Sequence, residues 1–364
     1  MRQPETLMIV FHDMRLGGIQ RKILDIIKYY QQHLPDTKIV LCLRKREGIF
    51  LDCIPPEIEV FAPNIHTNNF NISWFTLWLI PKIATLKPSR ILSFMDLGTV
   101  PTFVALQLLP WLKPRLTIGE DILTSKYIYT ETFPPLRRLL IKWLYPLADT
   151  ILVQTPIQKK DLENMIYKSS PNKKIVASPN WLPLDFPPPQ IIPQKTRHID
   201  ILFVGRIDDQ KNLPLFLKII NLVKKDLPRI VVKIVGDGDD RIKIEKLIKK
   251  LSLQKNVEII KPTLNTTQYY SNSKVFLLSS NYEGFPLTLM EAISCGCLPV
   301  LRNIPEISQF FTKDKSKIIF GTETEAVNLI LNNLKKPDEI YIKPYLKKIL
   351  KYQQKHITDY VKYI

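Results

Sequence analysis

The chain has 364 residues, which is long for one domain and suits two domains of about 150–200 residues each. Hydrophobic residues make up 45% and charged residues 24%, a globular composition that excludes an intrinsically disordered chain. Lysine and arginine number 52 against 34 acidic residues, and the net charge of +18 favours an acidic partner such as a phosphorylated ligand or an anionic membrane surface.

The positive charge has a second explanation, because a lysine-rich composition also produces many solvated lysines that bind nothing. The sequence lacks the spacing of a zinc finger or a basic zipper, and its basic residues are not interleaved with aromatic residues as in RNA-binding modules. We therefore expect no nucleic-acid partner and retain phosphorylated ligands and membrane surfaces as candidates.

The sequence carries little that would direct the chain across a membrane. Its uncharged apolar stretches, Phe70–Ile80 among them, are shorter than the ~20 residues of a membrane span. Met1–Thr6 is polar, so we expect no secretory signal. Four cysteines do not suggest a disulfide framework, and we expect a cytoplasmic protein that binds, at most, to the inner face of the membrane.

Strand-like and helix-like segments alternate in the first half of the chain. Apolar runs at Leu7–Phe11, Lys38–Leu43, Arg90–Phe94 and Thr150–Val153 predict strands. Apolar residues at helical spacing predict helices at Ile19–Tyr30, Trp74–Ala84 and Leu136–Leu147. This order is typical of a parallel sheet with helices on both faces.

A proline-rich stretch, Trp181–Lys195, interrupts the alternation and predicts a linker, because proline ends helices and central strands. The alternation then restarts with strands at Ile199–Val204, Ile230–Val235, Val257–Ile260 and Val275–Leu278, and helices at Leu213–Lys225, Arg241–Leu251 and Leu289–Cys295. We predict an α/β protein with two doubly wound Rossmann-like domains, 1–186 and 187–340, whose ligand lies in the cleft at the carboxyl ends of the strands. A lysine-rich helix at 341–364 is expected to pack back on the first domain.

Two glycine- or cation-bearing turns are candidate phosphate sites. Gly17 and Gly18 precede a helix, whose N-terminus favours negative charge, although a tight turn alone explains such glycines. Arg206 and Lys211 follow a strand, and their cationic groups suit a diphosphate, although a surface loop also carries such residues.

The most specific segment runs from Ser279 to Ala292. Glu283 lies in a loop with glycine and proline, and Glu291 lies within the following helix. The carboxylates suit the hydroxyls of a sugar and of a ribose, and the backbone N–H groups at the helix start suit an anion. The alternative is that each glutamate caps the helix. A third turn, Gly236–Gly238, is explained by the turn itself.

These segments resemble the motifs of glycosyltransferase family 4, whose members are retaining enzymes of the GT-B fold. The resemblance extends from about Leu7 to about Phe310. Its segments are Gly17-Gly18-Ile19-Gln20-Arg21 (G-G-x-E-R in the family), Ser178-Pro179-Asn180 (P-N-G-V/I), Val204-Gly205-Arg206 with Gln210-Lys211-Asn212 (G-R…K-N/G), Val235-Gly236-Asp237-Gly238 (G-x-G-D/P) and Glu283–Val300 (E-G-F-P-x(4)-E-A-x(3)-G-x-P-V).

The resemblance implies sugar transfer from a UDP- or GDP-linked donor with retention of configuration, by a hexosyl- or N-acetylhexosaminyltransferase that needs no metal or other cofactor. It implies catalytic roles for Arg206, Lys211 and Glu283. It implies donor binding by Gly17, Gly18, Gly205, Gly284, Phe285, Leu287, Thr288 and Glu291. The expected acceptor is a saccharide or lipid-linked saccharide of an envelope glycan such as lipopolysaccharide or capsule.

The acceptor side departs from the family pattern. Met95 and Asp96 stand where many members have a functional histidine, and Glu120-Asp121 replaces a Glu-Arg pair of some members. Asp96, Glu120 and Asp121 are therefore only candidate acceptor-side residues. Alternatives for the whole chain are another GT-B enzyme such as a nucleotide-sugar epimerase, or a non-catalytic nucleotide- or nucleic-acid-binding protein.

Two helical segments of the first domain suit a membrane surface. Phe70–Lys82 places Trp74 and Trp78 one turn apart. Leu136–Leu147 combines Arg137, Arg138 and Lys142 with leucines and Trp143. Basic and aromatic residues on an amphipathic helix are typical of interfacial binding, although both segments also suit core packing.

Overall fold

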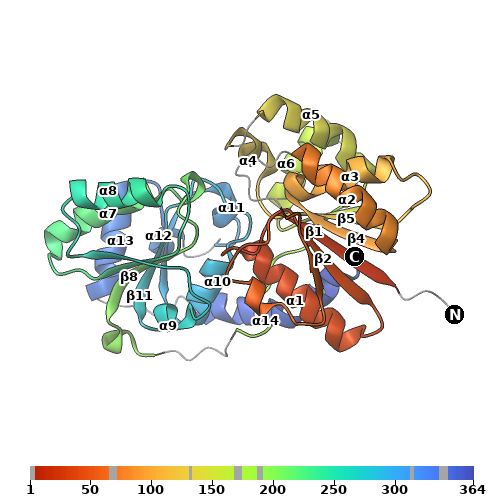
Figure 1. The fold of residues 1–364 in the computed structure, drawn as a ribbon. Helices are drawn as coiled ribbons and strands as arrows, with labels where there is room; N and C mark the ends of the chain where they lie inside the picture. Colours follow the sequence, from red (N-terminus) through yellow and green to blue (C-terminus); the bar gives the residue numbers. More distant parts are fainter. Residues whose placement is uncertain are drawn as a thin grey trace. The chain divides into compact units, whose positions relative to one another are not determined.

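A computed structural model describes residues 5–64, 72–130, 133–167, 174–186, 192–311, 315–335 and 343–364 (Figure 1). The chain divides into two compact units. Unit 1 comprises Met1–Asn180 with Lys355–Ile364, and unit 2 comprises Trp181–Gln354. The first segment of unit 1 thus ends at Asn180, just before the proline-rich stretch, whereas the sequence placed the domain boundary after residue 186.

Unit 1 is built on a parallel sheet in which the described residues form seven strands, ordered β3-β2-β1-β4-β5-β6-β7. The strands are β1 (Thr6–Phe11), β2 (Lys38–Leu43), β3 (Glu59–Phe61), β4 (Arg90–Phe94), β5 (Arg115–Glu120), β6 (Thr150–Val153) and β7 (Ile175–Ala177). Every residue of β1 is buried, as expected for a central strand covered on both faces. The carboxyl ends of all these strands therefore lie at one edge of the sheet.

Two groups of helices accompany this sheet. Helices α2 (Ile72–Leu86), α3 (Met95–Gln107), α4 (Thr124–Thr130), α5 (Pro134–Leu144) and α6 (Pro156–Tyr167) pack against one another in series on one face. Helix α1 (Gly18–His33) lies on the other face (Figure 1). Short 3-10 turns occur at Leu51–Cys53 and Tyr145–Leu147.

Unit 2 repeats the architecture with six strands among its described residues, ordered β10-β9-β8-β11-β12-β13. They are β8 (Ile199–Val204), β9 (Val232–Val235), β10 (Val257–Ile260), β11 (Ser273–Leu278), β12 (Leu298–Arg302) and β13 (Ile319–Phe320). The helices are α7 (Leu213–Asp226), α8 (Arg241–Lys250), α9 (Thr267–Ser271), α10 (Leu287–Ser294), α11 (Pro305–Ser308), α12 (Lys315–Ile318) and α13 (Glu323–Lys335). Turns of 3-10 helix lie at Gln194–Thr196 and Asp209–Lys211.

The last helix, α14 (Lys343–Val361), runs through the boundary between the units. Its final residues belong to unit 1, where Ile357, Tyr360 and Val361 are buried. The Thr117 hydroxyl of β5 donates a hydrogen bond to the Tyr363 carbonyl at 2.6 Å. The end of the chain is therefore an integral part of unit 1.

The predicted fold class is confirmed, and the predicted strands and helices all occur, with ends that differ by up to three residues. Two of these differences have a clear local cause. The strand predicted from Ile230 begins at Val232, because the Ile230 N–H bonds the Leu227 carbonyl in a turn. The helix predicted over Leu136–Leu147 runs over Pro134–Leu144, and a 3-10 turn containing Pro146 follows. Within the described residues, no helix has both the length and the apolar character to cross a bilayer.

Candidate active site

The predicted donor residues of unit 2 gather at the carboxyl ends of neighbouring strands. Gly205 and Arg206 follow β8, Gly236 follows β9, and the loop that begins at Ser279 follows β11. Strands β9, β8 and β11 lie side by side in this order. Segments far apart in the sequence therefore meet at one edge of the sheet, where ligands bind in open α/β folds.

The turn after β9 requires glycine at Gly236. Its φ of +155° lies in a region that favours glycine, and a Cβ there would lie 1.9 Å from the Gly205 carbonyl oxygen. Gly236 thus allows the turns after β8 and β9 to touch. This supports the structural interpretation of the glycine turn and explains how Arg206 is held beside the β9 loop.

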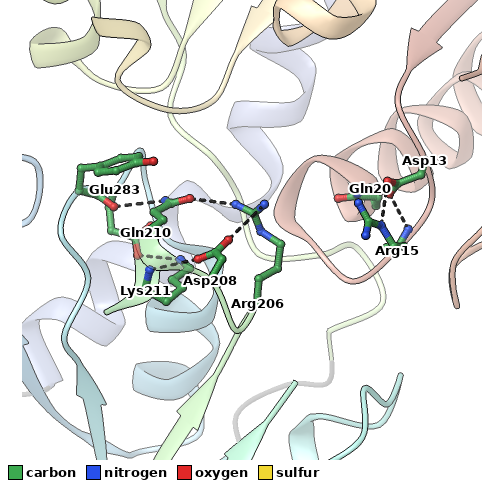
Figure 2. Close-up of polar contacts among 9 residues, drawn as sticks. Asp13, Arg15, Gln20, Arg206, Asp208, Gln210, Lys211 and Glu283 are labelled. Atoms are coloured by element: carbon green, nitrogen blue, oxygen red, sulfur yellow. Dashed lines mark hydrogen bonds and ion pairs between the residues drawn. The ribbon is translucent and has the colours of Figure 1, made fainter. Parts of the chain in front are cut away.

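Lys211 and Glu283 form the central contact of this edge (Figure 2). Their Nζ and Oε1 atoms are 2.7 Å apart, and the side chains are 13% and 4% exposed. The Ser280 hydroxyl donates a second hydrogen bond to Oε1 of Glu283 at 2.5 Å. Both predicted catalytic groups are therefore paired with each other in a setting with little access to water, where electrostatic interactions are stronger than in bulk solvent.

Arg206 is more accessible, with 53% of its side chain exposed. Its guanidinium donates to Oε1 of Gln210 at 2.9 Å and lies 3.3 Å from the Asp208 carboxylate (Figure 2). Gln210 in turn donates to the Tyr282 carbonyl at 3.2 Å. The two cations predicted to face a diphosphate thus each have an acidic neighbour, a compensation that the sequence did not predict.

The start of α10 supplies the backbone groups expected of an anion site. Gly284 is buried, and Pro286 is the residue before the helix. The N–H groups of Leu287 and Thr288 are in the first turn and have no acceptor within the helix. Phe285 packs edge-on against Phe310, with ring centres 4.6 Å apart, which fixes the loop in front of these N–H groups.

Glu291 lies on α10 and is 2% exposed. One of its carboxylate oxygens accepts a hydrogen bond of 2.8 Å from the Tyr270 hydroxyl. Tyr270 belongs to α9, so that the carboxylate is oriented from outside its own helix. The contact with Tyr270 explains the position of the Glu291 carboxylate without helix capping. The predicted ribose-binding role of Glu291 stays a prediction.

In unit 1, the turn before α1 is organised by Asp13 (Figure 2). Its carboxylate accepts from Nε of Arg15 at 2.9 Å and from Nε2 of Gln20 at 3.2 Å, and His12 contacts it at 2.6 Å. Burial opposes ionisation of Asp13, but His12 and Arg15 outweigh it and hold its pKa below the usual range. The donor-binding role of Gly17 and Gly18, which follow this turn, stays a prediction.

The three acceptor-side candidates are buried in unit 1 and are held by internal partners. Asp96 pairs with Arg137 at 2.7 Å, and Asp121 pairs with Lys22 at 2.7 Å. Arg137 is therefore a buried structural cation and not the exposed membrane-binding group that the helical pattern suggested. The acceptor-side role of these carboxylates stays a prediction.

Glu120 differs from Asp96 and Asp121, which pair with cations, because its carboxyl group is held by hydroxyl groups. It accepts hydrogen bonds from the Tyr145 hydroxyl at 2.5 Å and from the Thr124 hydroxyl at 3.1 Å. Burial raises the pKa of Glu120 to about 8, and the nearby charge of Asp96 adds to this shift. Glu120 is thus a proton-holding carboxyl at neutral pH.

Several residues of the site were not predicted from the sequence. Ser280, Gln210, Asp208 and Tyr270 all contact a predicted catalytic or donor residue. Ser280 and Gln210 lie within the quoted motifs, so their proximity in the sequence was an available signal. Tyr270 had none, because only the packing of α9 beside α10 brings it to Glu291.

The described residues contain no cluster of three or more histidine, cysteine or carboxylate side chains placed to hold a metal ion. The Asp208 carboxylate faces Arg206, and Asp237 faces Arg241 at 3.6 Å. The groups of unit 2 that suit a diphosphate by their own chemistry are Arg206, Lys211 and the first backbone N–H groups of α10.

Residues 189–347 match the family described as glycosyl transferases group 1. This segment is similar to that family. The matched segment contains both halves of the Lys211–Glu283 pair, so the site described above is the edge of the group 1 domain. The group 1 assignment is confirmed, whereas the finer assignment to family 4 stays a prediction.

Two curated relatives share the domain. The chain is 34% identical over 171 residues to an uncharacterized glycosyltransferase of Methanocaldococcus jannaschii, covering 45% of this chain and 41% of the relative. It is 32% identical over 197 residues to the N-acetylgalactosamine-N,N'-diacetylbacillosaminyl-diphospho-undecaprenol 4-alpha-N-acetylgalactosaminyltransferase of Campylobacter jejuni, covering 52% and 51%. The aligned region spans about half or less of these relatives' length.

The similarity in fold covers nearly the whole chain. The structure of Anabaena HepE in complex with UDP and glucose superposes with a TM-score of 0.77, covering 99% of this chain and 100% of that chain at 12% identity. This shows that both units have the Rossmann-like architecture of GT-B proteins.

Proposed function

We propose that this protein is a retaining glycosyltransferase that moves a hexosyl or N-acetylhexosaminyl group from a nucleotide diphosphate sugar to a saccharide or lipid-linked saccharide. The observation that carries the proposal is the Lys211–Glu283 ion pair beside Arg206 at the edge of the group 1 domain. Glu283 offers a carboxylate for sugar hydroxyls, and the ammonium group of Lys211 lies 2.7 Å from it. Arg206 is linked to the same loop through Gln210, which donates to the Tyr282 carbonyl.

Three features of the donor edge support this chemistry. Lys211 and Arg206 supply positive charge where the leaving diphosphate gains negative charge, and such preorganised groups stabilise a transition state effectively. The first N–H groups of α10 supply further donors to an anion. Glu283, held by Lys211 and Ser280, is fixed in one orientation and can accept hydrogen bonds from the sugar.

The ion pair also suggests an order of events. Before donor binding, the charges of Lys211 and Glu283 satisfy one another. A diphosphate that approaches Lys211 competes with Glu283 for the ammonium group and leaves carboxylate capacity for a sugar hydroxyl. Donor binding would therefore separate the Lys211–Glu283 pair, so that the ammonium group contacts the diphosphate while the carboxylate contacts the sugar. No metal ion is needed for this step.

The donor base and the acceptor are inferred from the relatives. HepE was solved with UDP, which favours UDP among the candidate nucleotides. The Campylobacter relative is named for an undecaprenol diphosphate acceptor, which favours a lipid-linked saccharide and a role in envelope glycan synthesis. A sugar epimerase or a non-catalytic nucleotide-binding protein is less favoured, because the group 1 match covers the entire donor edge.

Thermal-shift measurements with UDP, GDP and ADP test the donor proposal. A nucleotide that binds only the folded protein raises the melting temperature, and we expect the largest rise with UDP. Arg206→Ala should reduce this rise. The matched control is Lys218→Ala, which removes an exposed cation of the same unit that pairs with Glu323.

A second experiment tests transfer itself. The protein is incubated with a UDP-sugar and an acceptor, and released UDP and glycosylated acceptor are measured by mass spectrometry. Failure of all three nucleotides to shift the melting temperature would refute the donor site. Binding without transfer to any saccharide or lipid-linked acceptor would favour the non-catalytic alternative.

A further inference from the structure

Large hydrophobic side chains are exposed along one segment of unit 1. The segment carries Tyr129, Phe133, Leu136, Leu139, Trp143 and Leu147, all of them exposed. Phe133 and Trp143 are 75% and 69% exposed, values unusual for aromatic residues of a folded domain. In unit 2, by contrast, the exposed large hydrophobic residues among the described ones are dispersed over different elements as Val231, Ile242 and Leu264.

Helix α5 arranges these residues as a stripe. Leu136, Leu139 and Trp143 recur at intervals of three and four residues and so lie on one face of the helix. Ile141 and Arg137 lie on the opposite side and are buried, Ile141 in the core and Arg137 against Asp96. The stripe therefore points away from the unit that carries it.

Two cations border the stripe. Arg138 and Lys142 are exposed and one turn apart, and at 100° per residue both fall between Leu139 and the buried side of the helix. Residues 133–147 contain no aspartate or glutamate. The exposed part of α5 is thus apolar along its centre and positive along one side.

Other parts of unit 1 also carry exposed apolar side chains. Trp74 and Leu77 are exposed on α2, and Leu108 and Trp111 are exposed just after α3. Helix α3 packs against both α2 and α5 on the same face of the sheet (Figure 1). On α2, Phe75 and Leu79 are buried instead, so this helix serves mainly the core.

We propose that the exposed face of α5 docks on the surface of an anionic lipid bilayer. Leu136, Leu139 and Trp143 would enter the headgroup region, while Arg138 and Lys142 would contact lipid phosphates. An apolar stripe with aromatic residues and a basic border is the pattern of a helix that lies in the interface plane. The net charge of +18 adds long-range attraction to an anionic leaflet.

A bilayer fits this face better than a second protein does. Arg138 and Lys142 are exposed beside the stripe, and residues 133–147 contain no acidic side chain, so this face complements a surface of uniform negative charge. Tyrosine and tryptophan favour the membrane interface, because one part of the ring system is apolar and the other forms hydrogen bonds. This proposal does not rest on the proposed transferase activity, since membrane binding is measured without a donor.

Cosedimentation with vesicles tests the proposal. We expect binding to vesicles of phosphatidylglycerol and phosphatidylcholine, little binding to phosphatidylcholine alone, and release at high salt. Arg138→Glu with Lys142→Glu should weaken binding by roughly tenfold or more. Leu139→Ser with Trp143→Ser should weaken binding at low salt as well, because the apolar contribution does not depend on salt.

Matched controls lie on α8 of unit 2. Lys246→Glu with Lys250→Glu makes the same change in charge at the same i, i+4 spacing, and Ile242→Ser removes an exposed hydrophobic residue. Both controls should bind vesicles like the unchanged protein. All the α5 substitutions replace exposed side chains, so unchanged melting temperatures are expected and are measured alongside.

Three results would overturn the proposal: no binding to anionic vesicles, equal binding to neutral vesicles, or equal loss in the α8 controls. Sedimentation velocity tests the alternative that a second copy of the chain binds this face. A dimer that dissociates on Leu139→Ser with Trp143→Ser, without any vesicle binding, would assign this face to a second copy of the chain.

Discussion

The ammonium group of Lys211 lies 2.7 Å from the Glu283 carboxylate, although the two residues are 72 positions apart in the sequence. The pair joins the turn after β8 to the loop after β11. Because both side chains are nearly buried, neither charge has water as a ready substitute for its partner. The pair is therefore expected to contribute to stability as well as to chemistry.

This relationship changes the expected effect of Lys211→Ala on the folded protein. A cation that faces an open, solvent-filled site can be removed with little effect on folding. Removing one partner of a buried ion pair leaves an uncompensated charge and costs about 3–5 kcal/mol. We now expect Lys211→Ala to lower the free energy of unfolding by an amount in the lower part of this range, since the pair retains some access to water.

A double-mutant cycle measures this effect. Glu283→Ala should destabilise in the same direction, and the double variant should be more stable than the sum of the two single effects predicts. Urea denaturation of the four proteins gives the coupling energy. Strictly additive effects would show that the two charges do not depend on each other.

Arg206→Ala provides the contrast. Half of the Arg206 side chain is exposed, so we expect little change in the free energy of unfolding. Turnover should fall by roughly a hundredfold, because one group that stabilises developing negative charge is lost. Steady-state kinetics with UDP-sugar and acceptor checks this. Near-normal turnover in Arg206→Ala would remove Arg206 from the catalytic assignment.

Glu291 and Glu283 are expected to serve different parts of the donor. Glu291→Gln should weaken binding of free UDP, since the ribose is present in the nucleotide. Glu283→Gln should spare UDP binding and reduce sugar transfer. Tyr270→Phe should share the Glu291→Gln defect in milder form, because the carboxylate loses the hydroxyl that orients it. Calorimetry with UDP separates these outcomes, and the reverse pattern would exchange the two roles.

Sugar transfer is expected to persist in excess EDTA. The groups proposed to bind the diphosphate are Arg206, Lys211 and the first N–H groups of α10, which need no bridging ion. Turnover is measured with EDTA, and again after magnesium or manganese is added back. A complete loss of activity that either metal restores would contradict this prediction.

Much of the fold was predictable because the buried strands are short apolar runs with clear ends. The strand at Ile199–Val204 is bounded by a polar segment and by Gly205, and its predicted limits agree with β8. Strand β5 was missed, since Thr117, Gly119 and Glu120 give a buried strand a polar appearance. Helix α3 was missed because Gly98 and Pro101 resemble helix-ending residues.

Only the site residues that lie in short sequence motifs could be predicted. Short motifs placed Arg206, Lys211 and Glu283 after strands, and parallel topology brings such strand ends together. The partners that set their charges depend on three-dimensional packing. Arg137 illustrates the limit: helical spacing suggested an exposed cation, whereas the packing of α5 against α3 buries it against Asp96, the second residue of α3.

Glu120 makes the stability of the protein depend on pH. Its pKa is raised from about 4.5 in the unfolded chain to about 8 in the folded protein, chiefly by burial. The folded state therefore holds a proton that the unfolded state releases between these values, and the contribution of Glu120 to stability declines as pH rises from about 5 to about 8.

In Glu120→Gln the group cannot ionise, and this part of the pH dependence should vanish. The test compares unfolding free energies of both proteins across this range. Glu57→Gln, which changes an exposed glutamate of the same unit, is the control. Parallel pH profiles for the unchanged protein and Glu120→Gln would show that Glu120 is ionised in the folded state, paired with a cation and not buried as a neutral acid.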